Sequence, residues 1–557
     1  MGPELDPTAL VERLRDDLGH RRIAEGLETL ARAEPLLEKI FPCPGCGIIV
    51  GLVAQWVDAG FDRPKLLQCL LHRFPKEDRS HLLLADFLHL RMAEAMVAMV
   101  DEDFAAAAEC LLVVKSFENQ VADRELLAIA NFWLGRCYRR MGRYREALEY
   151  TERAEALALD CGYLQMAAIM QVTRSWLAFQ RGKLQEAGAL LRQAEAALHR
   201  TGDYLNRGNI QSAYGRIARR QGKYDQALEY FERAIAEYRA GGGGQLQLAR
   251  ALLNLAFVER LIALEAHHSA DTAARSRRSS PSSPFGSVRE QRARINATRS
   301  SAWDHLQESY EIFSKAQSHR GVAGVHLNRG FLSLDAGDLD RAAAEAVEAF
   351  EHGTARVDAI IIARARTLQC IVENTAMEEQ LGDCFLHRDA AEAFARDAVK
   401  FAAKTENRRL LARAYVWQGL TLAAQPADLE AARRCCEQAM ALLQPEGLER
   451  QYTWDDLELL KQKLLGAQPV ESVLRAWSAG IVENTTFQQM TEEFARIVIP
   501  KVWEREGRKI SKVAEKLSIS PKKVRRILHS AGVSVGHAPS PAPRPKSTVQ
   551  PGDMQNE

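Results

Sequence analysis

Basic side chains are concentrated near the end of the chain, at a spacing that suits contact with a polyanion. Residues 501 to 529 contain ten Lys and Arg against three Glu, a net of +7, although all 557 residues together carry only +1. Val524, Ile527 and Leu528 recur at helical spacing, so the basic residues between them must face outward. An outward basic face suits contact with nucleic-acid phosphates. The residues that we expect to contact duplex DNA are Ser511, Lys512, Ser520, Lys522, Lys523, Arg525, Arg526 and His529.

Two short helices joined by a tight turn would position these side chains. Ser520 is suited to cap a helix N-terminus and Pro521 to occupy its first turn, so a second helix begins there. Ala514 is the small residue at which the two helices would cross, and Ile519 would fill the turn. The pattern predicts a helix-turn-helix domain at residues 466–536, whose second helix enters a major groove.

This stretch resembles the C-terminal DNA-binding domain of Fis and of NtrC-type activators. The resemblance rests on a lead-in helix with Phe494, the Gly507 turn, the small Ala514 and a basic second helix that ends before Gly532. It implies contacts to bases or nearby phosphates from the second helix, and backbone contacts from the first. The residues on one apolar face of the lead-in helix are Phe487, Met490, Phe494, Ile497 and Val498.

The stretch departs from the family pattern at three places. Ser518 stands where the family usually has glycine, which implies strain at a positive φ. Pro500 interrupts the lead-in helix, and one extra residue lies between Gly507 and Ala514. Because the spacing around Gly507 and Ile510 also suits a LuxR-type module, the subfamily stays open, as does homodimer formation.

Cys43 and Cys46 form a second candidate site, because the sequence Cys-Pro-Gly-Cys matches the Cys-x-x-Cys pattern of thioredoxin-type redox motifs. That motif follows a strand in a βαβ unit, and no neighbouring segment reads as a strand. A zinc site would need a second pair of ligands at suitable spacing. We therefore expect a helix–helix turn here, with an oxidoreductase as a weak alternative. With no Walker motif, catalytic triad or paired-carboxylate pattern, we expect no enzyme, cofactor or metal.

A period of forty residues organises the middle of the chain. Gly142, Gly182 and Gly222 are forty apart, and small or aromatic residues follow them in the same phase. The residues five and twelve places after each glycine are Ala147, Ala187, Ala227, Ala154, Ala194 and Ala234. Small residues let two helices approach closely. This pattern resembles the tetratricopeptide repeat (TPR), in a long form, and predicts an all-α solenoid of helix hairpins.

The resemblance to TPR proteins also implies a groove lined by the first helix of each repeat. Aligning Gly135, Ser175 and Gly215 places basic and aromatic residues toward that groove. They are Arg136, Arg139, Trp176, Phe179, Arg216 and Arg219, with Arg140 and Arg220 beside them. Such a surface would bind an acidic, partly apolar peptide or protein. The alternative is that the arginines are solvated and that Trp176 and Phe179 are buried between repeats.

Composition and breaks in the pattern set the expected domain organisation. Only 7% of the residues are aromatic, and ten cysteines scattered through helical patterns indicate reduced thiols in a cytoplasmic protein. The longest apolar run, 46–57, is too short for a membrane span, and the start lacks a signal peptide. The expected parts are degenerate hairpins at 1–79, TPR solenoid at 80–265, a disordered basic insertion at 266–301, further solenoid and a capping helix at 302–465, the helix-turn-helix domain at 466–536 and a disordered tail at 537–557.

Together these features predict a DNA-binding transcriptional regulator whose TPR solenoid senses or recruits a partner. The alternative is a TPR scaffold or adaptor that does not bind DNA specifically.

Overall fold

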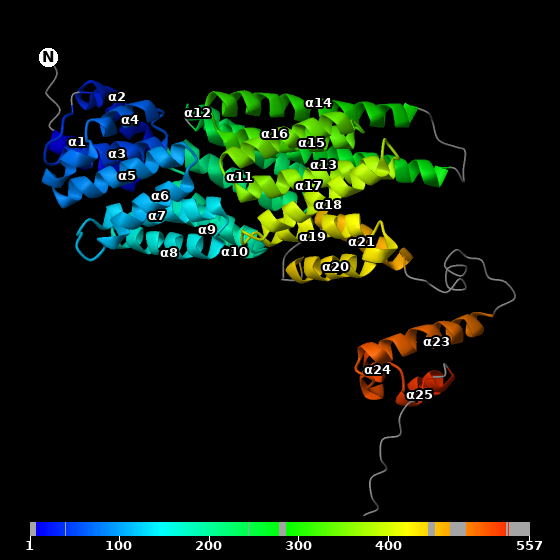
Figure 1. Cartoon of the computed structure of the whole chain (residues 1–557). Coiled ribbons are helices and arrows are strands. Elements are labelled where there is room, and N and C mark those ends of the chain that lie inside the picture. Colours follow the sequence, from blue (N-terminus) through cyan, green and yellow to red (C-terminus); the bar gives the residue numbers. More distant parts are fainter. Residues whose placement is uncertain are drawn as a thin grey trace, which may run out of the picture. The chain divides into compact units, whose positions relative to one another are not determined.

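The chain divides into two units, Met1–Ala467 and Gln468–Glu557. The computed structural model describes residues 7–38, 40–242, 244–277, 286–443, 452–467, 486–530 and 533. Throughout these residues the ordered elements are helices (Figure 1), which confirms the predicted all-α class. None of the described helices is both long and apolar enough to cross a bilayer.

Unit 1 is a succession of helices in which neighbours pack as hairpins. Its helices are α1 (Pro7–Gly19), α2 (Ile23–Leu37), α3 (Cys46–Ala59), α4 (Pro64–His72), α5 (Leu84–Val100), α6 (Phe104–Ser116), α7 (Arg124–Met141), α8 (Tyr144–Asp160), α9 (Leu164–Gln180), α10 (Leu184–Leu198), α11 (Tyr204–Arg220), α12 (Tyr224–Ala240), α13 (Gln245–Arg277), α14 (Gly286–Lys315), α15 (His319–Asp335), α16 (Leu339–Ala355), α17 (Ala359–Glu378), α18 (Cys384–Ala402), α19 (Arg408–Leu422), α20 (Leu429–Leu443) and α21 (Tyr452–Ala467). Short 3₁₀ turns occur at Lys76–His81 and Pro426–Asp428.

The forty-residue period appears directly in the helix boundaries. The first helices α7, α9 and α11 begin at Arg124, Leu164 and Tyr204, and their partners α8, α10 and α12 each begin twenty residues later. The turn glycines Gly142 and Gly182 have φ of +81° and +86°. Residues with a side chain rarely adopt such angles, so glycine is favoured at both turns. The predicted repeat phase is therefore confirmed.

Small residues set the distance between the two helices of a hairpin. A Cβ on Gly135 would lie 2.4 Å from Thr151 Oγ1, and one on Gly215 would lie 2.9 Å from the ring of Phe231. Ala147 and Ala227, on the partner helices, are fully buried. Close backbone approach at the predicted positions therefore packs each hairpin at the density of a protein interior.

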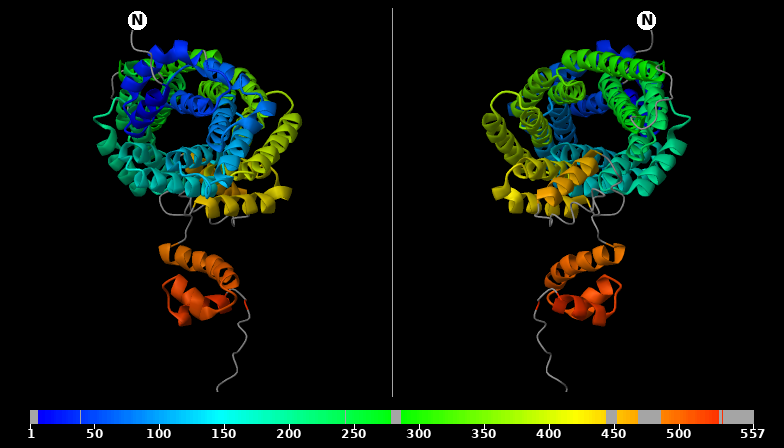
Figure 2. Two further views of the ribbon diagram at one scale, coloured as in Figure 1. Left: turned by 90° about the vertical axis from the view of Figure 1, so that its left-hand side faces the viewer. Right: turned by 90° about the vertical axis from the view of Figure 1, so that its right-hand side faces the viewer.

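The helices of unit 1 wind around a common axis (Figure 2), and segments far apart in sequence meet where the winding returns. Arg21 Nε donates to Asp203 Oδ2 at 2.7 Å across 182 residues. Ser318 Oγ donates to Glu102 Oε1 at 2.6 Å across 216 residues. The backbone N–H of Glu406 donates to the carbonyl of Gly142 at 2.8 Å. Unit 1 is thus a superhelix whose successive turns are hydrogen-bonded to each other.

The prediction of a disordered insertion at 266–301 is wrong for most of that stretch. Helix α13 continues to Arg277 and α14 begins at Gly286, while residues 278–285 lie outside the described part. The sequence argument underestimated tertiary support. Ile295 is buried, Ser301 Oγ donates to Glu259 Oε1 at 2.6 Å, and Arg299 Nη2 donates to the carbonyl of Asp335 at 3.0 Å.

Unit 2 contains α23 (Phe487–Arg505), α24 (Ile510–Lys516) and α25 (Pro521–Ser530), which share one small core. Helix α23 continues through Pro500. Its buried residues include Ile499 and Trp503, whereas Phe487 and Phe494 from the predicted apolar face are 84% and 53% exposed. The core therefore lies at the C-terminal end of α23.

The ion pair between Arg21 and Asp203 gives a first prediction. Both side chains are buried, at 6% and 0% exposure, so Arg21→Met leaves a carboxylate without its counterion. We expect a loss of about 3–5 kcal/mol in the free energy of unfolding. Adding Asp203→Asn should recover part of it. Urea unfolding followed by circular dichroism measures both.

Arg13→Met is the matched control, because Arg13 pairs with Asp17 at 3.9 Å while 56% exposed. Its cost should stay below about 1 kcal/mol. Equal urea unfolding midpoints for Arg13→Met and Arg21→Met would contradict a structural role for the Arg21–Asp203 ion pair.

Candidate functional site

The first helices of the repeats bring a set of arginines together inside the superhelix. We call this set the interior arginine cluster. It consists of Arg139 and Arg140 on α7, Arg216 and Arg219 on α11, Arg250 on α13, Arg364 on α17 and Arg409 on α19. Each of these residues keeps partial solvent contact, yet protein surrounds it. They are therefore half-buried and lie among residues of several helices.

Burial and mutual repulsion disfavour the charges of this cluster. Burial, together with the nearby charges of Arg136, Arg216 and Arg250, lowers the pKa of Arg139 to about 9. Burial likewise lowers the pKa of Arg250 to about 10, and the nearby charge of Glu102 opposes part of this shift. Both values stay above pH 7, so the side chains remain cationic and the folded protein carries the cost of keeping them together.

Carboxylates near the cluster are already engaged elsewhere. Asp58 accepts from Arg136 and, at 3.0 Å, from Trp133 Nε1. Glu102 accepts from Ser318 and from the backbone N–H of Arg320 at 2.9 Å.

Within the described part of the chain several members form no ion pair with a carboxylate. These are Arg139, Arg140, Arg216, Arg250, Arg364 and Arg409. A buried charge without a partner is costly and is normally compensated. An anionic ligand would supply that compensation.

Aromatic rings hold some of these guanidinium groups in place. Arg139 lies 4.9 Å from the ring centre of Trp176, which meets Tyr144 edge-on at 5.4 Å. Phe179 is only 5% exposed. The guanidinium carbons of Arg220 and Arg409 lie 4.9 and 5.0 Å from the centre of the Phe179 ring. Both guanidinium groups also donate to the backbone carbonyl of Phe179. Trp176 is thus half-buried beneath an arginine, whereas Phe179 is buried between two.

The structure brings together most of the predicted groove residues. Arg139, Arg216 and Arg219 belong to the cluster, and Arg219 Nη1 donates to Asn254 Oδ1 at 3.3 Å. Arg136 lies nearby but is paired with Asp58. The ring of Trp176 packs against Arg139, and the buried ring of Phe179 packs against Arg220 and Arg409.

Sequence reasoning missed three members of the cluster, Arg250, Arg364 and Arg409, because they lie outside the clearest repeats. One sequence signal was available: in α7, α9, α11, α13, α15, α17 and α19 every basic residue other than histidine is arginine, never lysine. Arginine keeps its proton when buried and stacks on aromatic rings, whereas a buried lysine tends to lose its charge.

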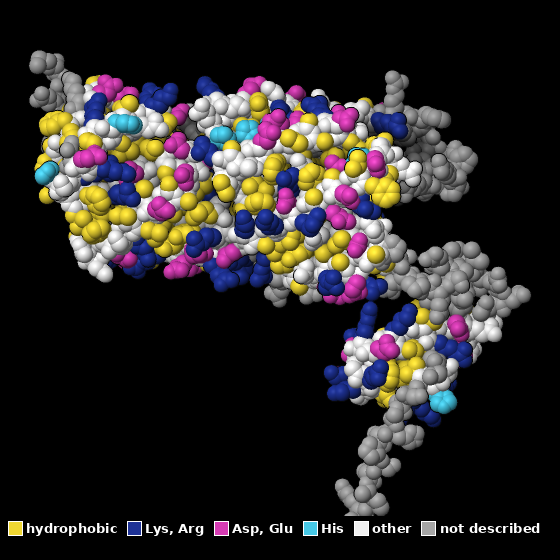
Figure 3. Space-filling view, in the orientation of Figure 1, with side chains coloured by type: hydrophobic (Ala, Val, Ile, Leu, Met, Phe, Trp, Pro, Cys, Tyr) yellow, Lys and Arg dark blue, Asp and Glu magenta, His cyan; other side chains and the backbone are white. Residues whose placement is uncertain are grey.

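The predicted DNA-contacting residues lie on one unit with a separate core. Lys522, Lys523, Arg525, Arg526 and His529 are all exposed on α25. Ser511 and Lys512 are exposed at the start of α24. Figure 3 shows basic side chains on the visible face of this unit.

The turn between α24 and α25 follows the expected local chemistry. Ser518 has φ of +51°, as the comparison with glycine implied. Ser520 Oγ accepts from the backbone N–H of Lys523 at 3.2 Å, which confirms Ser520 as the cap of α25. This cap and the buried Val524 fix which face of α25 turns outward.

The cysteine pair lies at a helix start, as the turn interpretation expected. Cys46 begins α3, Gly45 has φ of +89°, and its backbone N–H donates to Asp86 Oδ2 at 2.9 Å. The sulfur atoms of Cys43 and Cys46 are 2.7 Å apart. Burial raises the pKa of Cys46 to about 12, which is the opposite of what a nucleophilic thiol needs.

A surface cavity of about 750 Å³ lies between α10, α11 and α12. Both carboxylates in its lining are hydrogen-bonded: Arg207 Nη2 donates to Glu237 Oε1 at 2.7 Å, and Tyr214 Oη donates to Glu195 Oε2 at 3.1 Å. We regard the interior arginine cluster as the better candidate, because six of its seven members form no ion pair with a carboxylate of the described residues.

Comparison with known proteins supports the repeat assignment. Tetratricopeptide repeat models match residues 128–161, 167–240 and 206–270. The chain therefore contains tetratricopeptide repeats, as the forty-residue period predicted. No curated protein matches the sequence.

Several solved structures resemble the chain at low identity. A Rap protein complexed with competence and sporulation factor has a TM-score of 0.50 at 12% identity, covering 72% of this chain and 98% of its own. NprR in complex with its cognate peptide NprX scores 0.47 at 12% identity, with coverages of 72% and 99%. An IFIT1 monomeric mutant with Gppp-AAAA scores 0.43 at 14% identity, with coverages of 83% and 94%. At such identities the Rap similarity indicates a shared fold.

The uncompensated charge gives a second prediction. Arg250→Gln removes the cost of burying a cation, which exceeds the attraction of that cation to Glu102, so the thermal midpoint should rise, by roughly 1–3 °C. Differential scanning calorimetry in low-salt buffer measures it. Arg220→Gln is the contrasting variant and should lower the midpoint, because Arg220 is 2% exposed and donates to the carbonyl of Phe179. A fall of similar size in both variants would mean that Arg250 is structural.

Proposed function

We propose that this chain is a non-catalytic, DNA-binding transcriptional regulator in which the TPR superhelix binds an acidic peptide or protein segment. The observation that carries the proposal is the interior arginine cluster, in which Arg139, Arg140, Arg216, Arg250, Arg364 and Arg409 form no ion pair with a carboxylate of the described residues. A ligand rich in carboxylates would replace repulsion among the arginines with ion pairs. Relief of this repulsion would contribute to the affinity for the ligand.

The geometry of the cluster favours an extended ligand over a single small anion. Its seven members come from five helices, α7, α11, α13, α17 and α19, so the guanidinium groups are spread over several repeats. Trp176, half-buried beneath Arg139, offers an apolar ring face beside the charges. A peptide with spaced acidic residues and one apolar side chain matches this arrangement. The Rap protein of similar fold was solved with competence and sporulation factor, so a superhelix of this kind can hold a ligand.

The exposed face of α25 supports the DNA-binding part of the proposal. Its five basic or histidine side chains are outside the core, and the described residues of unit 2 offer them no carboxylate partner. A helix with a fixed orientation and an outward basic face can enter a major groove. The competing function is a TPR adaptor whose basic end has no specific DNA target.

Substitutions on α25 test DNA binding in the full-length protein. A labelled duplex pool selected for binding would be titrated by fluorescence anisotropy over a series of salt concentrations. Arg525→Ala or Arg526→Ala should cost about 1–3 kcal/mol if that side chain reads a base. Loss of a phosphate contact should instead reduce the slope of log K against log salt by about 1.

Arg496→Ala is the matched control, since Arg496 is exposed on α23 and pairs with Glu493 at 3.4 Å. It should leave the affinity nearly unchanged. If the Arg525→Ala/Arg526→Ala double variant binds DNA with the same affinity as the parent protein, the TPR adaptor function replaces the DNA-binding regulator as the proposal.

Charge reversal inside the superhelix tests the peptide site. Arg139→Glu with Arg216→Glu should abolish binding of labelled peptides that carry several Glu and one Leu or Phe, because it reverses charge at the centre of the cluster. Arg136 is not used, since Asp58 already neutralises it. Isothermal titration calorimetry measures the affinity.

The control for the peptide site is Arg396→Glu with Arg434→Glu, which makes the same charge change at exposed positions on α18 and α20. Circular dichroism should show unchanged helicity in both double variants. Equal peptide affinity for the interior and exterior variants would place the binding surface elsewhere.

A further inference from the structure

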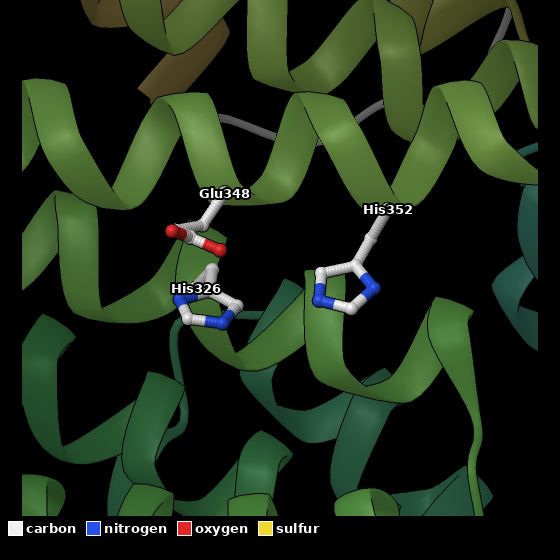
Figure 4. A group of neighbouring side chains, drawn as sticks. All are labelled: His326, Glu348 and His352. Atoms are coloured by element: carbon white, nitrogen blue, oxygen red, sulfur yellow. The ribbon is translucent and has the colours of Figure 1, made fainter.

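Three side chains that commonly bind metal ions converge on the hairpin of α15 and α16. His326 comes from α15, and Glu348 and His352 lie one turn apart on α16. Their candidate ligand atoms all lie within 4.8 Å of one another. Figure 4 shows the Glu348 carboxylate beside the ring of His326, with the ring of His352 next to them. None of the three belongs to the interior arginine cluster.

The ring of His326 is held by a carboxylate from outside this group. His326 Nδ1 and Glu345 Oε2 are 2.6 Å apart, and a carboxylate accepts, so Nδ1 carries the proton. The lone pair is then on Nε2. A carboxylate on the far nitrogen is the usual partner of a metal-binding histidine, because it fixes the tautomer and makes the free nitrogen more basic. Tyr310 meets the ring edge-on at 5.7 Å and limits its rotation.

The ring of His352 is held in a comparable way. His352 Nδ1 lies 3.2 Å from Nδ1 of His319, at the start of α15, so one imidazole donates to the other. The His326 and His352 rings are nearly parallel, at 17° with centres 5.9 Å apart.

We propose that His326, Glu348 and His352 form a binding site for a divalent transition-metal ion of the zinc class. Two imidazole nitrogens and one carboxylate oxygen are a recurrent zinc donor set that leaves a further position for water. Mg²⁺ and Ca²⁺ prefer all-oxygen ligands and do not fit this set.

The required movement is small. With bonds of about 2.0–2.1 Å in a tetrahedral site, ligand atoms lie about 3.3 Å apart. The group spans up to 4.8 Å, so closing it requires shifts of about an ångström. Glu348 is exposed and can make most of this adjustment by rotation of its side chain.

Other histidine–glutamate pairs in the described chain lack this convergence. His387 Nδ1 lies 2.6 Å from Glu373 Oε2 and His305 Nδ1 lies 2.9 Å from Glu259 Oε2, but neither pair has a third ligand in reach. An ordinary surface pair therefore accounts for those two histidines, whereas the site on α15 and α16 combines two rings, a nearby carboxylate and an outer partner for each ring.

The site lies on a hairpin that also joins two turns of the superhelix. Ser318 and Arg320, on either side of His319, both donate to Glu102 in the turn between α5 and α6. An ion that links α15 to α16 would stabilise the hairpin that makes this contact. Metal binding should therefore raise the thermal midpoint of the full chain.

Titration of the full-length protein, free of any polyhistidine tag and stripped with chelator, tests the site. Zn²⁺ should bind with one saturable equivalent by calorimetry, and Co²⁺ should show visible absorption typical of four-coordinate nitrogen and oxygen ligation. His326→Gln and His352→Gln should each weaken Zn²⁺ binding at least 100-fold. Glu345→Gln, which alters only the outer partner of His326, should weaken it about 10-fold.

His387→Gln is the matched control and should leave Zn²⁺ affinity unchanged, because it removes an equivalent histidine–glutamate pair. Cys43→Ser with Cys46→Ser excludes thiol ligation. Absence of a saturable equivalent in the parent protein would overturn the proposal. So would binding that survives His326→Gln with His352→Gln, or that disappears only when the cysteines are replaced. The parent titration decides the question even if a variant folds poorly.

Discussion

The structure of unit 1 depends on how closely the two helices of each hairpin approach. At Gly135 and Gly215 a Cβ would collide with the partner helix, and the alanines opposite are fully buried. Because this spacing repeats every forty residues, each hairpin is placed on the next by a similar rotation, and the chain winds into a superhelix. The winding turns the first helices inward, which is why arginines from helices far apart in sequence meet.

The interior arginines combine a proposed role in ligand binding with an unfavourable contribution to the stability of the fold. The pKa values of Arg139 and Arg409 fall to about 9 because burial and neighbouring cations disfavour the charged form. The superhelix tolerates this since its hairpins are stabilised elsewhere, by apolar contacts between helices. In the zinc site proposed on α15 and α16, Glu345 and His319 likewise orient the imidazole rings before any ligand binds.

Sequence reasoning reached the fold through local patterns and missed features that depend on tertiary contacts. The forty-residue phase placed the boundaries of α7 to α12, and the cap at Ser520 placed the start of α25, because turns and caps are set by nearby residues. The helical extensions at 266–277 and 286–301 were not predicted, since polar composition conceals contacts such as Ser301 with Glu259. Arg250, Arg364 and Arg409 were not predicted as cluster members for a similar reason. Which face of a helix turns inward depends on the winding of the whole unit. Likewise His326, Glu348 and His352 share no sequence motif, and only the packing of α15 on α16 brings them together.

The hydrogen bonds between successive turns change how the repeat array should respond to thermal fluctuation. In an open solenoid each repeat touches only its neighbours, so the ends can fray independently and unfolding can spread like a zipper. Here Arg21 is joined to Asp203, Glu102 to Ser318 and Gly142 to Glu406, so local opening in one turn must break contacts in another. These long-range links make unit 1 a cooperative body. They also raise its contact order, and therefore slow its folding relative to an unlinked array of the same helices.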